Sequence, residues 1–144
     1  MKEFILKNIQ IVYEGIVIME ILNKYFLLFD EARTSKSAKE ELISLFSEDM
    51  SFVLAGNIKN GIDEWKKFLD LIYENNADIK HMHEEWKFNK STNRYEAKWA
   101  VCGKSKDGKV YTKLGIDIAE IDEQGKIKYL ENVPDDSKLF ENYK

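Results

Sequence analysis

The feature that most constrains the fold of this 144-residue chain is a change of hydrophobic period near residue 78. Before that point apolar side chains recur at helical spacing, and after it they alternate at a spacing of two, as in strands. Helices followed by short-looped strands predict an α+β domain, in which three helices pack on one face of a curved antiparallel sheet. The length fits one domain over residues 1–144 and is sufficient to bury a core.

Three helices and one strand are predicted in the N-terminal half. The helices are expected at 9–32, 39–46 and 60–76, and the strand at 50–56. On the first helix, Leu22, Tyr25 and Phe29 recur at helical spacing, so one face of this helix is expected to be buried.

Four further strands are predicted, joined by short polar turns in which glycine supplies the positive backbone angle. Their ranges are 79–89, 94–104, 109–122 and 126–133. Both faces of the third of these strands are largely apolar, so its outer face needs a cover. A second copy of the sheet is the simplest cover, and the sequence therefore predicts a homodimer through the outer face of the sheet.

Charge and composition exclude several classes of partner. The formal net charge is −4 and the lysines are scattered, which argues against nucleic acid and anionic membranes. Charged residues interrupt the apolar N-terminal run, so neither a membrane span nor a signal peptide is expected. The single cysteine, Cys102, suits a reducing compartment, and we expect a soluble cytoplasmic protein.

Several strings resemble the nuclear transport factor 2-like superfamily and, within it, the SnoaL-like and ketosteroid-isomerase-like branch. They are "KYFLLFD" in the first helix, "LFSEDMSFVLAG" entering the first strand, "GIDEWKKFL" opening the third helix, and "GIDIAEIDEQGKIKYLENVPD" over the last two strands. The resemblance implies a cone-shaped domain whose sheet wraps around a deep pocket that the helices close.

The resemblance also implies which residues face that pocket. In the isomerases, a tyrosine on the first long helix and an aspartic acid on the penultimate strand form the oxyanion hole, and Tyr25 and Asp117 stand at the matching places. The isomerase's proton acceptor falls near Leu54, which cannot accept a proton, so steroid isomerisation is not expected. The histidine and aspartate of SnoaL-like cyclases correspond to Leu130 and Asn132, which removes the cyclase's acid as well.

We therefore expect a pocket that binds a small apolar molecule with one polar end and uses no cofactor. The expected ligand-binding residues are Tyr25, Leu54, Trp99, Asp117 and Asn132. A first alternative is a lyase, isomerase or polyketide-cyclase-like enzyme with Asp117 as acid and Glu84 as base, because Glu84 shares an apolar strand face with Met82 and Trp86. A second alternative is a protein-interaction module with a vestigial pocket.

Asp117 leaves two interpretations open. In an apolar pocket it would stay partly protonated and hydrogen-bond a ligand. Alternatively, it forms an ion pair with Lys113 or Lys128, since buried acids are rare unless they are paired or functional.

His81 and His83 lie two residues apart and project to the same strand face. A zinc site needs a third ligand, which this face does not offer, so no metal site is predicted. We expect the face to be solvated or part of an interface.

Overall fold

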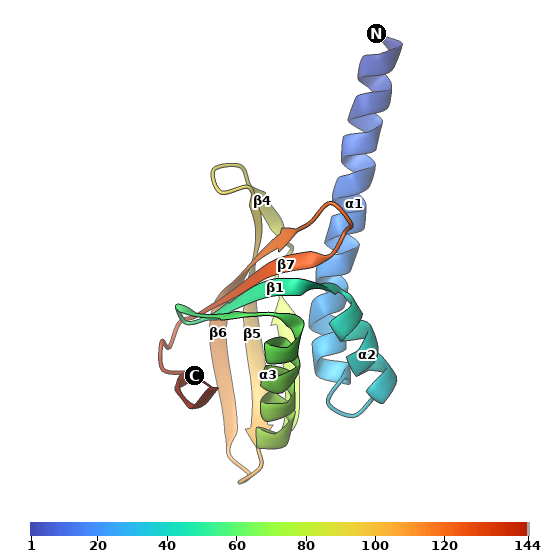
Figure 1. Ribbon diagram of the computed structural model, residues 1–144. Helices are drawn as coiled ribbons and strands as arrows, with labels where there is room; N and C mark the ends of the chain where they lie inside the picture. The colour runs from blue at the N-terminus through green and yellow to red at the C-terminus, as the bar shows by residue number, and fades with distance from the viewer. Residues whose placement is uncertain (144) are drawn as a thin grey trace.

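The computed structural model describes residues 1–143 and contains three α-helices and seven strands (Figure 1). The helices are α1 Lys2–Glu31, α2 Lys36–Ser44 and α3 Ile62–Asn75, with a short 3-10 helix, η1, at Glu141–Tyr143. The strands are β1 Phe46–Leu54, β2 Asn57–Asn60, β3 Asn76–His83, β4 Lys87–Asn89, β5 Arg94–Ser105, β6 Val110–Ile121 and β7 Ile127–Pro134. The predicted α+β class is confirmed.

The strands form one curved sheet in the order β2-β1-β7-β6-β5-β3, with β4 paired to β5 beside β3. All pairs are antiparallel except β1 with β7, which run parallel. The sheet is therefore mixed, whereas the sequence predicts an antiparallel one. The sequence pattern did not reveal the parallel pair of β1 and β7, because these two strands lie far apart along the chain. Helix α3 is part of the connection between them.

Local sequence explains the helix boundaries. The α2 helix begins after Ser35, whose hydroxyl accepts the backbone N–H of Ala38 at 3.2 Å, as an N-cap does. The α3 helix follows Gly61, which adopts a φ of 94° that few other residues tolerate. Trp65 and Leu69 on α3 are buried, and this helix covers one face of the sheet (Figure 1).

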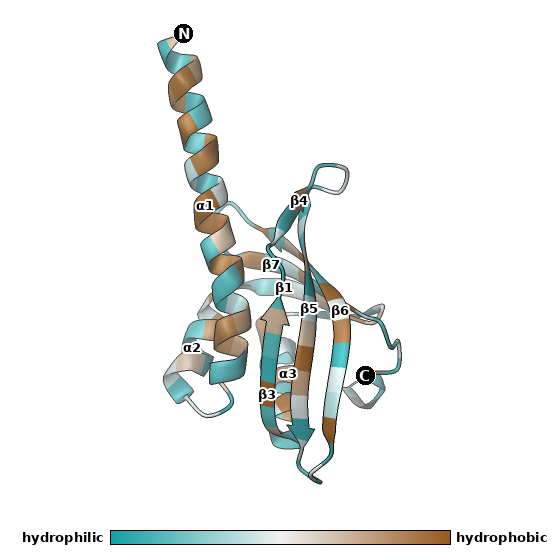
Figure 2. Cartoon of the chain, turned by 180° about the vertical axis from the view of Figure 1, so that it is seen from behind, coloured by the Kyte–Doolittle hydropathy of each residue, from teal (hydrophilic) through white to brown (hydrophobic). Residues whose placement is uncertain are grey.

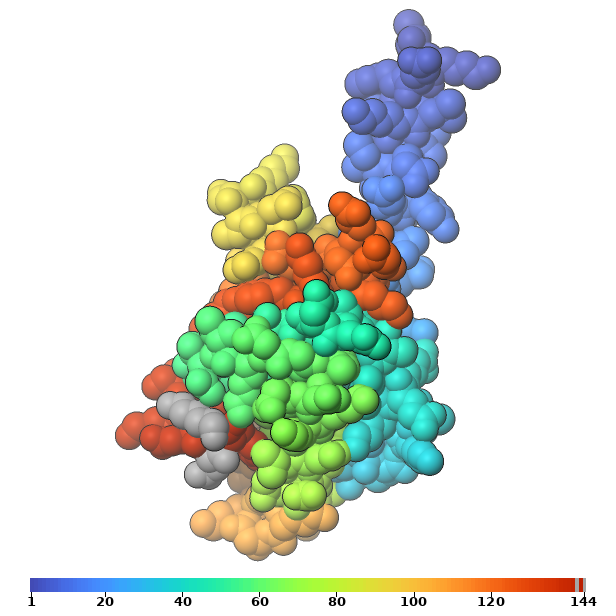
Figure 3. Space-filling model, in the orientation of Figure 1, coloured from blue at the N-terminus to red at the C-terminus, as the bar shows by residue number. Residues whose placement is uncertain are grey.

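The first half of α1 projects beyond the rest of the domain (Figures 1 and 3). The sequence predicts a helix start near residue 9, whereas the helix begins at Lys2. Only the second half carries buried residues, from Leu22 to Phe29, and it packs beside β3. None of the helices in the described residues is long and apolar enough to cross a membrane.

Candidate functional site

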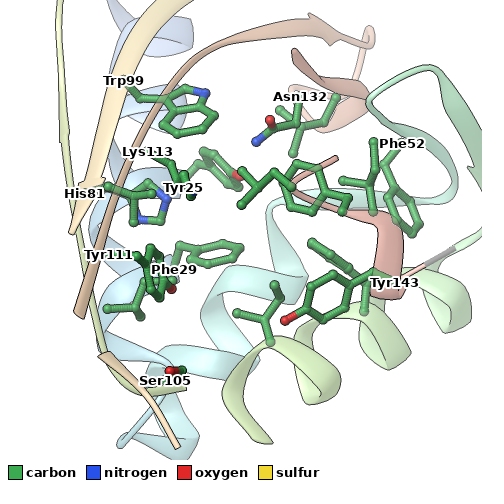
Figure 4. Close-up of a pocket in the computed structure, with 18 of the residues that line it drawn as sticks. Tyr25, Phe29, Phe52, His81, Trp99, Ser105, Tyr111, Lys113, Asn132 and Tyr143 are labelled. Atoms are coloured by element: carbon green, nitrogen blue, oxygen red, sulfur yellow. The ribbon is translucent and has the colours of Figure 1, made fainter. Parts of the chain in front are cut away.

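A cavity of about 410 Å³ lies between α1, α3 and the inner face of the sheet (Figure 4). Aromatic and aliphatic side chains make most of its wall, among them Phe29, Phe52, Leu54, Phe68, Ile72 and Val101. A concave apolar cavity with few polar groups is typical of a small-molecule site. Its volume lies at the lower end of the range of about 300–1,000 Å³ that is usual for small-molecule pockets.

Four of the five predicted ligand-binding residues line this cavity. They are Tyr25, Leu54, Trp99 and Asn132. Asp117 does not line it, because its side chain is buried behind the wall and only 1% exposed. The structure nevertheless brings Asp117 into contact with two of the lining residues.

Strand register and one glycine place Asp117 beside Trp99. On the inner face of the sheet, Asp117 is flanked by Ala97 on β5 and Asn132 on β7, and Trp99 lies opposite Gly115. A Cβ atom at Gly115 would lie 2.3 Å from Cζ2 of Trp99, so the absence of a side chain lets the indole lie across β6. From there its Nε1–H donates to Oδ1 of Asp117 at 3.0 Å.

The environment of Asp117 favours the neutral acid. Burial raises the pKa of its carboxyl to about 8, although hydrogen bonds from Trp99 and Tyr25 act in the opposite direction. The alternative of an ion pair is not found. Lys113 lies 3.6 Å from Asp136, and Lys128 lies 3.9 Å from Glu120.

Tyr25 connects this buried acid to the cavity. Its hydroxyl points into the cavity (Figure 4), and burial raises its pKa well above the usual range. A protonated Asp117 can accept the Trp99 N–H on one oxygen and donate its own proton to the Tyr25 oxygen. The Tyr25 proton is then free to be donated to a ligand.

Glu84 lies elsewhere. It is exposed in the segment between β3 and β4 and borders a shallow depression on the outer face of the sheet, with Lys98 and Leu114. The chain leaves strand geometry at 84–86, so the alternation that predicts Glu84 beside Trp86 does not continue through this segment. The structure does not bring Glu84 and Asp117 together.

The sequence interpretation missed His81, which lines the cavity. Its Nδ1 lies 2.6 Å from Oδ1 of Asp30, and its backbone N–H donates to Oδ2 of Asp30 at 2.6 Å. The two side chains are only 13% and 19% exposed, so the expectation of a solvated or interface face is wrong for His81. An available signal was Asp30 itself, an acid directly after the buried Phe29 in "KYFLLFD".

Two polar atoms of lining residues have no hydrogen-bond partner within the described chain. They are Oδ1 of Asn132, an acceptor, and Nε1 of Trp65, a donor. Buried polar atoms without partners are rare in native proteins, and each costs about 1–3 kcal/mol. Residues 1–143 contain no group of three or more His, Cys, Asp or Glu side chains placed to share a metal ion.

No family model matches the sequence, and no curated protein matches it either. Solved structures do match. An NTF2-like protein of unknown function from Exiguobacterium sp. 255-15 is 50% identical, with a TM-score of 0.79 over 81% of this chain and 98% of that one. About a fifth of this chain therefore has no counterpart in that match.

More distant structures share the fold. One is the epoxide hydrolase/cyclase-like enzyme SalBIII, which has a role in pyran ring formation in the polyether salinomycin. It is 11% identical, with a TM-score of 0.68 over 81% of this chain and 89% of that one. A Mycobacterium tuberculosis protein in complex with estradiol-17β-hemisuccinate is 12% identical, with a TM-score of 0.66 over 81% and 92%. At this level of identity the likeness shows the shared fold. The Exiguobacterium NTF2-like protein shares half of its aligned residues with this chain, along nearly its whole length. This chain therefore belongs to the nuclear transport factor 2-like superfamily.

Proposed function

We propose that the protein binds a small, largely apolar molecule with a polar end in the cavity between α1, α3 and the sheet. The observation that carries the proposal is the hydroxyl of Tyr25, which is directed into a cavity of about 410 Å³ whose wall is mostly aromatic and aliphatic.

The polar end of the ligand is expected at Tyr25. The hydroxyl of this residue is directed into the cavity and its proton is available once Asp117 is protonated. An acceptor such as a carbonyl oxygen fits this donor. Leu54, Trp99 and the phenylalanines would surround the apolar body of the ligand.

Calorimetric titration with tetralin and 2-tetralone tests the proposal, because the two bicyclic compounds differ by one carbonyl group. Wild-type protein should bind the ketone at least tenfold more tightly, and Tyr25→Phe should remove most of that difference. Tyr13→Phe is a matched control, since Tyr13 is exposed on the projecting half of α1. Equal affinity for both compounds, or no binding of either, would count against the proposal.

The two alternatives, an enzyme with Asp117 and Glu84 and a protein-interaction module, receive less support. An enzyme with Asp117 as acid and Glu84 as base would need both groups at one substrate, and Glu84 does not line the cavity. A protein-interaction module with a vestigial pocket would have a filled cavity, whereas this one has a volume of about 410 Å³.

We further propose that the protein is a homodimer through the outer face of the sheet and that it acts in the cytoplasm. The outer face carries exposed apolar side chains on strands β3, β6 and β7, namely Met82, Val110, Leu114 and Val133. An apolar patch of this kind is typical of a subunit interface. The cytoplasmic location is proposed because the single cysteine suits a reducing compartment.

A further inference from the structure

We propose that the ligand of the cavity is an organic anion, with a carboxylate that binds the ammonium group of Lys113 and a carbonyl oxygen that meets Tyr25. This inference rests on the proposed function and deepens it, because it adds a second polar group to the ligand of the same cavity. The expected ligand class is an apolar keto acid of modest size.

The charged side chains in the cavity wall carry positive charge. Lys109 and Lys113 line the cavity, whereas none of the aspartates and glutamates of the described chain does so. This bias is opposite to that of the whole chain, which has 26 acidic and 22 basic side chains. Two acids lie behind the wall, but burial favours the neutral form of Asp117, and Asp30 is bound to His81. A wall of this charge favours an anionic ligand.

Strand register places Lys113 on the inner face of the sheet. It lies opposite Val101 of β5 and two residues before Gly115, and alternate residues of a strand project to the same face. A hydrophilic band interrupts the apolar stretches of β6 (Figure 2), and Lys113 lies on the cavity wall that carries Trp99 (Figure 4). The side chain of Lys113 is 35% exposed and lines the cavity, so its ammonium group is accessible to a ligand.

The ion pair that Lys113 forms leaves room for a ligand. Its Nζ lies 3.6 Å from Oδ2 of Asp136, which is longer than the roughly 2.7–2.9 Å of a charge-assisted hydrogen bond. Asp136 follows β7, is half exposed and does not line the cavity. An ammonium group has several N–H donors, and a contact of this length does not use them all. A ligand carboxylate can therefore join Asp136 at Lys113 or displace it.

Trp99 separates the two polar ends of the cavity. Lys113 and Asp117 are four residues apart on β6, so their Cα atoms are separated by about 13 Å along the strand. The indole of Trp99 lies across Gly115, between these two residues. Because Tyr25 contacts Asp117, a carbonyl at Tyr25 and a carboxylate at Lys113 would be separated by the indole. A flat apolar body with a polar group at each end fits this arrangement.

Lys109 is expected to contribute less than Lys113. It lies in the turn between β5 and β6, where its backbone N–H donates to Oδ1 of Asp107 at 3.1 Å. Its side chain is exposed, and the charge of Asp107 offsets its own. Interactions between charges in such a solvated position are weak. Lys109→Met should therefore lower the affinity for an anionic ligand less than Lys113→Met does.

Calorimetric titration with 2-tetralone-6-carboxylate and its carboxamide tests the inference. Both compounds contain the bicyclic ketone, and they differ in the charge of the group at the opposite end from the carbonyl. Wild-type protein should bind the carboxylate at least tenfold more tightly than the carboxamide. Added salt should reduce this preference, because salt screens the ion pair with Lys113.

Three variants show whether the preference arises at Lys113. Lys113→Met keeps the apolar stem and removes the charge, so it should remove most of the preference for the carboxylate. Lys128→Met is the matched control, because Lys128 also lies near an acid, 3.9 Å from Glu120, and does not line the cavity. Asp136→Asn removes the competing carboxylate, so it should raise the affinity for 2-tetralone-6-carboxylate severalfold and leave that for the carboxamide unchanged. A change in folding alone would alter both affinities together.

Binding of the carboxamide separates this inference from the proposed function. If the carboxamide binds and the carboxylate binds no more tightly, the anionic ligand is overturned while the proposed function stands. If neither compound binds and 2-tetralone does not bind either, both proposals fail. A preference for the carboxylate that Lys113→Met leaves unchanged, with a wild-type thermal midpoint, would also overturn the inference.

Discussion

The indole N–H of Trp99 donates to Oδ1 of Asp117 at 3.0 Å, and these two side chains form the polar support behind the cavity wall. Neither partner is charged when Asp117 is protonated, so the contact needs no counter-ion. Asp117 lies between Ile116 and Ile118 in the sequence, and its inward-facing neighbours, Trp99 and Tyr25, are the hydrogen-bond partners that a buried acid requires.

Gly115→Ala should disrupt this contact. The new Cβ atom would lie 2.3 Å from Cζ2 of Trp99, and the indole would have to move away from Asp117. We expect a loss of about 1–3 kcal/mol in the free energy of unfolding, the usual cost of overpacking. Gly15→Ala is the control, since nothing lies within 4 Å of its Cβ position and a helical alanine should stabilise. Urea unfolding and near-UV circular dichroism measure both effects, and an unchanged Gly115→Ala would contradict the packing described.

Asp117→Asn should change how stability depends on pH. The folded pKa of about 8 lies above the unfolded value near 3.8, so between these pH values the folded state holds one more proton than the unfolded state. The contribution of Asp117 to stability is therefore full at low pH and lost as pH rises towards 8. Asparagine does not titrate, so the difference in unfolding free energy should shift in the variant's favour by about 1 kcal/mol per pH unit.

Urea unfolding at pH 5, 6 and 7 measures that difference. Asp136→Asn serves as the control, because Asp136 is an exposed acid near Lys113 and should show no such trend. A difference that stays constant between pH 5 and 7 would mean that Asp117 is ionised in the folded protein, as it is in the unfolded chain.

Leu114→Glu should weaken the proposed dimer through the sheet. Leu114 is 52% exposed at the centre of the outer face, and a buried unpaired charge at an interface is costly. Sedimentation velocity should show a population of smaller mass at micromolar concentration. Ile58→Glu places the same charge on the edge strand β2 at a similarly exposed position and should leave the mass unchanged. Equal masses for Leu114→Glu and wild type would exclude this interface.

The sequence was sufficient to predict features that depend on the local spacing of apolar residues. Alternation along β5 and β6 places Trp99 and Asp117 on the inner face, and helical spacing buries Tyr25, as the structure confirms. It was insufficient where contact depends on distant segments. Asp30 and His81 are 51 residues apart, and only the packing of α1 beside β3 brings them together.

Irregular strand geometry limited the prediction of strand boundaries from the sequence. The strand predicted at 79–89 divides into β3 and β4, and residues 84–86 between them are not extended. Trp86 is buried there while Met82 is 66% exposed, so a single alternating face cannot describe both. Strand β2 has only four residues, too few for a clear pattern.

The Tyr25 hydroxyl, supported by Asp117, is proposed to bind the polar end of a ligand within the cavity. The most direct measurement is the carbon-13 chemical shift of the carbonyl of 2-tetralone, labelled at that carbon and bound to the protein. A hydrogen bond from Tyr25 polarises the carbonyl and should move the signal downfield of its position in hydrocarbon solvent, and Tyr25→Phe should abolish that displacement. A bound ketone whose signal stays at the hydrocarbon value, or is unchanged by Tyr25→Phe, would contradict the account.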